Sequence, residues 1–196
     1  MQLLPLVKQL WIVQPGPHND RWFQRTVFNA RSLAYFSALT NVQELGIDGL
    51  DLQMLTPRGL SYFEYFAPTL RSLILRDPMC THRQFFYFLG LFPNLDDLNL
   101  VHSFTWRLES DPVPSPQSAP SFRGRLTMRW ESGEMFLREL SELSGGLRFR
   151  HLNLVEGLCV RFLLDACVET LETLRVHPMY WISSKWHSQG LYSSDH

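Results

Sequence analysis

A short frame recurs along the whole chain: an apolar residue, two variable residues, a leucine, one variable residue and a second apolar residue. It occurs at 7–12, 42–47, 70–75, 95–100, 149–154 and 171–176, and with one extra residue at 122–128. Its middle leucines are Leu10, Leu45, Leu73, Leu98, Leu126, Leu152 and Leu174. Such a repeat constrains the fold strongly, because one small unit cannot bury its apolar face unless its neighbours stack against it.

The intervals between the frames predict what each repeat contains. The middle leucines are 35, 28, 25, 28, 26 and 22 residues apart, and the last five intervals match the roughly 20 to 29 residues of a leucine-rich repeat. Segments with apolar residues at helical spacing lie between the frames, at 21–39, 56–66, 81–91, 131–143 and 158–168. We therefore expect an α/β fold: an irregular leucine-rich-repeat solenoid of about seven repeats over 1–178, with a parallel sheet on its concave face and helices on its convex face.

Residues next to the frame leucines should face outwards, because side chains alternate across a strand. The outward row read from the frames contains Trp11, Val13, Gly46, Asp48, Ile74, Arg76, Asn99, Val101, Thr127, Arg129, Asn153, Val155, Arg175 and His177. The row has no task in the core, so we predict a protein-binding surface there. Its candidate residues are Trp11, Asp48, Arg76, Asn99, Val101, Arg129, Asn153 and Arg175.

Three phrases, at 68–75, 92–100 and 162–176, resemble the leucine-rich-repeat region of fungal F-box proteins, in particular the mushroom-type group with irregular repeats. The resemblance implies a substrate-recognition part of a ubiquitin ligase receptor. Two features depart from the family. The Asn or Cys that regular repeats place three residues after each frame is missing, and no F-box is visible in these 196 residues. Binding of a Skp-type adaptor would need an upstream F-box, so we expect this chain alone not to bind one. The first strand is apolar, so we also expect either that an upstream domain packs against it or that the chain is a truncated product.

Composition narrows the possible partners. The chain is 45% apolar and 19% charged, with a formal charge of -1, so neither nucleic acid nor a membrane is an expected partner. Residues 1–13 lack the basic start and cleavage site of a signal peptide, and no window has the roughly 18 apolar residues of a spanning helix. Cys80, Cys159 and Cys167 form no CxxC pair, which favours a reducing compartment, the cytoplasm or nucleus, over disulfides or zinc.

No catalytic or metal-binding motif stands out, so we predict a non-enzymatic protein with no cofactor and no metal. The seven histidines form no helical pair and are expected to be solvated or in loops. Cys167 with Asp165 and His151 is the one conceivable nucleophile set, and nothing places the thiol beside a base. A free-standing scaffold or inhibitor unrelated to ubiquitin is the main alternative function, and a hydrolase with an unrecognised site is the third.

Two segments stand outside the repeats. Residues 111–120 are rich in Pro and Ser and predict a projecting loop, in which Ser115 precedes a proline and could be phosphorylated. Residues 179–196 contain no frame, and the sequence leaves open whether they cap the array or stay disordered.

Overall fold

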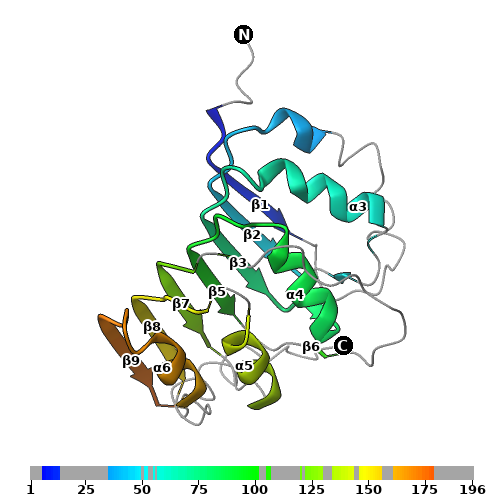
Figure 1. Cartoon of the computed structure of the whole chain (residues 1–196). Coiled ribbons are helices and arrows are strands. Elements are labelled where there is room, and N and C mark those ends of the chain that lie inside the picture. The colour runs from blue at the N-terminus through cyan, green and yellow to red at the C-terminus, as the bar shows by residue number, and fades with distance from the viewer. Residues whose placement is uncertain are drawn as a thin grey trace, which may run out of the picture.

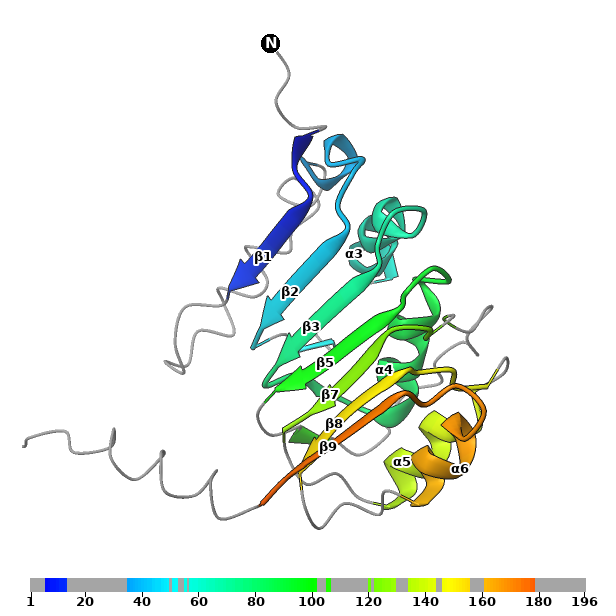
Figure 2. The ribbon, with the colours of Figure 1, turned by 90° about the vertical axis from the view of Figure 1, so that its left-hand side faces the viewer.

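The computed structural model describes residues 6–13, 35–49, 51–52, 55, 57–101, 105–106, 120, 122–129, 134–143, 146–155 and 161–178. Within these ranges the chain forms an α/β structure, in which a parallel sheet carries its helices on one side (Figures 1 and 2). None of the helices in these ranges has the length and hydropathy needed to cross a membrane.

Seven parallel strands form one open sheet, and their order in space follows their order in the chain. They are β1 (Gln9–Val13), β2 (Glu44–Asp48), β3 (Ser72–Arg76), β5 (Asp97–Val101), β7 (Arg125–Met128), β8 (His151–Val155) and β9 (Thr173–His177). A small second sheet, which the frames do not predict, pairs β4 (Met79–Cys80) with β6 (Thr105–Trp106).

The frame leucines set the register of the large sheet. Leu10 pairs with Leu45, Leu45 with Leu73, and the series continues without a shift to Leu174. The five leucines from Leu45 to Leu152 are buried in the core. A shift of one residue in any strand would turn its leucine to the other face, so burial of the row fixes the register.

The helices differ in part from the expected segments. Helix η2 (Tyr35–Ala38) is a 3-10 turn at the end of 21–39, of which 21–34 lie outside the described residues. The segment 56–66 is not one α-helix, because α3 (Pro57–Ser61) changes into the 3-10 helix η4 (Tyr62–Phe66). Helices α4 (His82–Gly90), α5 (Glu134–Ser141) and α6 (Arg161–Cys167) lie within the three remaining segments.

Helix α4 shows how the sequence defines an element. The Thr81 hydroxyl accepts a hydrogen bond from the Gln84 N–H, while the Gln84 side chain accepts one from the Thr81 N–H. This capping box satisfies two amide groups that a helix start leaves free. Phe85 and Phe88 then enter the core, where Phe88 meets Phe63 edge to face at 5.2 Å. The aromatic clusters therefore serve packing.

The last strand does not follow the expected burial. Leu174 and Val176 occupy inward frame positions, yet 45% and 48% of their surface is exposed. Strand β9 is the edge of the sheet, so no further strand among the described residues lies beyond these two side chains.

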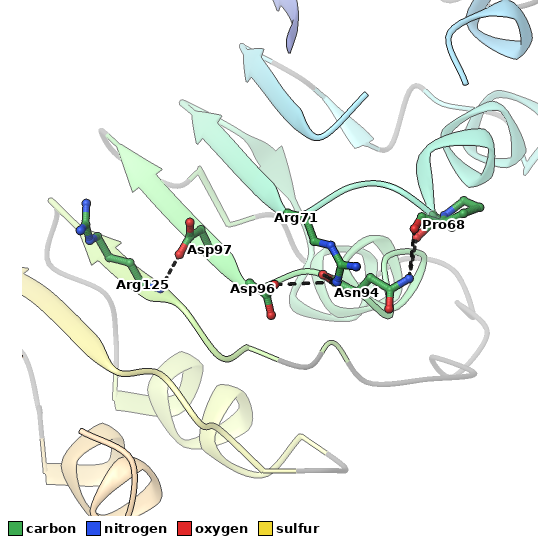
Figure 3. A network of polar contacts seen from close by, with 7 residues as sticks. Pro68, Arg71, Asn94, Asp96, Asp97 and Arg125 are labelled. Atoms are coloured by element: carbon green, nitrogen blue, oxygen red, sulfur yellow. Dashed lines mark hydrogen bonds and ion pairs between the residues drawn. The ribbon is translucent and has the colours of Figure 1, made fainter. Parts of the chain in front are cut away.

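The extra residue of the seventh frame is absorbed where β7 begins. Between other neighbouring strands, one carbonyl oxygen before a strand accepts hydrogen bonds from two N–H groups at the start of the next strand. The Arg71 oxygen, for example, accepts from the Asp96 and Asp97 N–H groups. At β7 the Asp96 oxygen accepts only the Gly124 N–H, and the Asp97 carboxylate accepts the Arg125 N–H (Figure 3). A Cβ on Gly124 would overlap the Asp97 Oδ1 atom, so a larger residue here would displace the carboxylate that accepts the Arg125 N–H.

Candidate protein-binding surface

The candidate surface is the face of the large sheet that points away from the helices, which we call the open face (Figure 2). All eight predicted residues belong to strands of this sheet or, for Arg129, follow one directly. Six of the eight side chains are half-buried or exposed and lie on β1, β2, β3, β5 and β8. They are Trp11, Asp48, Arg76, Asn99, Val101 and Asn153. Arg129 and Arg175 are exposed at the β7 to β9 side.

One cluster joins the first three strands across the open face. The Trp11 ring crosses the backbone of β2 at Gly46, where an added Cβ would overlap the ring atoms. On β3 the Arg76 guanidinium carbon lies 5.0 Å from the centre of the same ring, and its Nη1 atom lies 4.0 Å from an Asp48 oxygen. Cation–π attraction and an ion pair therefore hold Arg76 over the sheet. The glycine is needed because any larger side chain would displace the indole.

The two asparagines of the row have different environments. The Asn153 Oδ1 atom lies 2.6 Å from the His177 Nε2 atom on the neighbouring strand. By contrast, the Asn99 Oδ1 atom is buried and has no hydrogen-bond partner among the described residues, and the same holds for the Arg76 Nε atom two strand positions away on β3. An unsatisfied buried polar atom carries a desolvation cost that a bound partner can relieve.

Three outward positions are more buried than the sequence predicts. Gly46 lies under the Trp11 ring, and only 5% of Thr127 and 3% of Val155 is exposed. Thr127 pairs with Asn99 on one side and Asn153 on the other, and Val155 pairs with His177. Small side chains in inner strands are shaded by longer neighbours about 5 Å away.

Sequence reasoning missed Arg125 and His151 as members of the open face. They stand directly opposite each other, one residue before the frame leucines of β7 and β8, and Arg125 is exposed. The same alternation that selected the positions after each leucine also selects the position before it. The signal was therefore present in the frame.

A polar hollow lies at the starts of β3, β5 and β7 and is lined by Arg71, Asn94, Asp96, Asp97, Arg123 and Gly124. Its groups are engaged with the fold: Arg71 lies 3.8 Å from an Asp96 oxygen and donates to the Asn94 carbonyl, and the Asn94 amide reaches the Pro68 carbonyl (Figure 3). These side chains form ion pairs and hydrogen bonds with one another and with the backbone, including the Arg125 N–H at the start of β7. We therefore assign the hollow a structural role.

The described cysteines are buried thiols. Burial and the nearby Asp51 charge raise the pKa of Cys80, and burial raises the pKa of Cys167 although a hydrogen bond with the Phe149 backbone opposes the shift. Raised pKa values keep both groups in the unreactive thiol form. Asp165, considered beside Cys167 as part of a nucleophile set, is instead exposed and pairs with Arg161 at 3.6 Å.

The expectation that the histidines are solvated or in loops is wrong for His82. His82 starts α4, its ring lies 2.7 Å from a Glu139 oxygen of α5, and its side chain is mostly buried. His151 is half-buried on β8, and His177 on β9 is exposed, as expected for a solvated histidine. The contact with the Glu139 carboxylate gives the mostly buried His82 ring a polar partner on the neighbouring helix.

Several predictions concern residues outside the described part of the chain. These include Cys159, the loop at 111–119 with Ser115, and the tail from Met179 to His196. Among the residues that are described, no group of three or more His, Cys, Asp or Glu side chains could hold a metal ion.

No known protein family, curated protein or solved structure matches the chain.

Proposed function

We propose that the chain is an irregular leucine-rich-repeat solenoid that acts as a non-enzymatic protein-binding module through its open face. The observation that carries the proposal is the outward row itself. Bulky, polar and charged side chains occupy it from Trp11 to Arg175, although they contribute nothing to the leucine core on the other face.

The register supports the solenoid part of this proposal. Parallel strands joined in chain order, with one leucine of each in a single row, are what stacked strand–helix units would produce. The unequal intervals and the inserted residue at β7 agree with irregular repeats.

The orphaned polar atoms support a binding role for the row. Arg76 Nε and Asn99 Oδ1 offer a donor and an acceptor on neighbouring strands of the same face. Both atoms are buried, so a partner would satisfy them only after the Arg76 and Asn99 side chains rotate towards it. Protein interfaces form about one hydrogen bond per 100–200 Å². By resemblance, the partner would be a substrate of a ubiquitin ligase receptor.

Site-specific photocross-linking tests the role of the open face. A photoreactive amino acid replaces Asn99 or Asn153 on the open face, or Glu142 or Arg148 elsewhere, and each variant is illuminated in cells of the source organism. We expect the two open-face positions to cross-link one common protein and the two control positions not to do so. Equal capture from all four positions, or capture from the control positions alone, would contradict the proposal.

A further inference from the structure

We propose that the part of the open face on β7, β8 and β9 binds an extended acidic segment of a protein partner. This inference rests on the proposed function and adds the chemistry of the partner to it. The argument starts from how charge is distributed along the open face.

The two ends of the open face differ in charge. Outward positions of the strands from β1 to β5 carry three acidic residues and one basic residue: Glu44, Asp48, Asp97 and Arg76. Outward positions from β7 to β9 carry no described acidic residue and instead hold Arg125, Arg129, Arg175, His151 and His177. A chain with a formal charge of -1 therefore concentrates positive charge at one end of one face.

The side chains of the three arginines at this end form no ion pair with the described residues. Other arginines at strand ends have acidic partners, as Arg71 has Asp96 and Arg150 has Glu172. Among the described residues, none of Arg125, Arg129 and Arg175 has a carboxylate within 4.0 Å of its guanidinium nitrogens. The nearest strand neighbour with a carboxylate, Asp97, bonds the Arg125 backbone N–H instead (Figure 3).

The backbone holds these arginines at defined spacings. Arg125 and Arg129 are four residues apart along β7, about 13 Å in an extended strand, and the Arg129 N–H is fixed by the Leu100 carbonyl at 3.1 Å. Arg175 lies two strands away, about 10 Å across the sheet. An extended polypeptide with carboxylates three to four residues apart spans the same distances.

Arginine suits this role better than lysine would. Its planar guanidinium binds a carboxylate through two parallel hydrogen bonds, and it is enriched among the residues that dominate interface energies. Only two of the 18 basic residues of the chain are lysines, Lys8 and Lys185.

An acidic protein segment fits the patch better than a nucleic acid does. Nucleic-acid binding without sequence preference needs a long positive groove and aromatic side chains for base stacking. Among the described residues of the face, the exposed aromatic residue is Trp11, which lies at the opposite end beside Asp48 and Arg76. The acidic half of the face would repel a phosphate backbone that extended beyond β7.

Fluorescence anisotropy with the full chain tests the inference. The probes are a labelled peptide of alternating Glu and Ser, the same peptide with Gln in place of Glu, and single-stranded oligothymidylate. The test variant is Arg125→Gln/Arg129→Gln/Arg175→Gln. The control variant, Arg123→Gln/Arg148→Gln/Arg161→Gln, removes the same charge from exposed residues elsewhere, and thermal melting verifies that both variants fold.

We expect the unchanged protein to bind the acidic peptide and to bind the glutamine peptide at least about tenfold more weakly. The test variant should lose about tenfold or more of its affinity for the acidic peptide, while the control variant keeps it. Added salt should weaken binding because these charges are exposed. Equal losses in the two triple variants, no binding of the acidic peptide, or tighter binding of the oligonucleotide would each overturn the inference. The cross-links at Asn99 and Asn153 would still report on the module independently.

Discussion

At the scale of single residues, the size of a side chain shapes the open face as much as its charge does. Gly46 leaves room for the Trp11 ring, and the ring then supports the Arg76 guanidinium at 5.0 Å. The frame pattern predicts that these residues share a face. It does not predict that the indole crosses β2, because that contact depends on the absence of one side chain.

Gly46→Ala should therefore destabilise the protein by about 1–3 kcal/mol, since the added methyl group overlaps the indole. The free energy of unfolding, measured by urea denaturation, checks this. In a Trp11→Ala background the same glycine substitution should cost much less. An equal cost in both backgrounds would show that Trp11 does not occupy this space.

The cysteines provide a second prediction for single residues. Because burial raises the pKa of Cys80 and Cys167, neither should react with a thiol reagent at neutral pH while the protein is folded. Their reactivity should increase only as the solution becomes more alkaline and thiolate forms. A Cys159→Ser variant isolates these two groups, and both should react after unfolding in guanidinium chloride. Stoichiometric labelling of the folded variant would contradict the buried placement.

At the scale of elements, the position of a strand in the sheet decides what a frame leucine contributes. Leu98 on β5 is fully buried, whereas Leu174 occupies the same frame position on the edge strand β9 and is 45% exposed. A pattern in the sequence assigns both to the core. The difference arises because a leucine needs a neighbour on each side, and the frame does not encode where the sheet ends.

This difference predicts unequal losses from the same substitution. Leu98→Ala should lower the free energy of unfolding by about 2–5 kcal/mol, because it leaves a cavity in a packed core. Leu174→Ala, at a half-exposed site, should cost about 1 kcal/mol or less. Chemical denaturation of both variants gives the comparison, and similar losses would mean that the two leucines have similar surroundings.

The inserted residue at β7 illustrates what an element can absorb. Its extra length would misalign the leucines, yet Leu126 still pairs with Leu98. The Asp97 carboxylate replaces a backbone carbonyl as the acceptor for Arg125, and Phe122 adopts a φ of 41°. Neither adjustment can be read from the frame, because both involve contacts between units.

At the scale of the whole molecule, periodicity predicts the parallel sheet, its register and the side on which the leucines lie. It fails where one part of the chain covers another: Thr127 and Val155 are buried on the open face, and the two-stranded sheet of β4 and β6 is unforeseen. Five of the eight proposed binding residues form two groups, with Trp11, Asp48 and Arg76 in one and Arg129 and Arg175 in the other. The frame alone does not predict these two groups. They differ because Arg76 forms an ion pair with Asp48, whereas Arg129 and Arg175 have no described carboxylate within reach.

The central claim, that a protein partner binds the open face, is tested most directly by the affinity of the cross-linked partner for Arg76→Ala/Asn99→Ala/Arg129→Ala/Asn153→Ala. A control with four exposed residues elsewhere changed to alanine (Thr40, Gln43, Arg148 and Arg161) matches the number of substitutions and the charge removed. Both proteins should fold. We predict that titration calorimetry shows at least about a tenfold loss of affinity for the open-face variant and none for the control. Full affinity in the open-face variant would place the binding site on another surface and contradict the account.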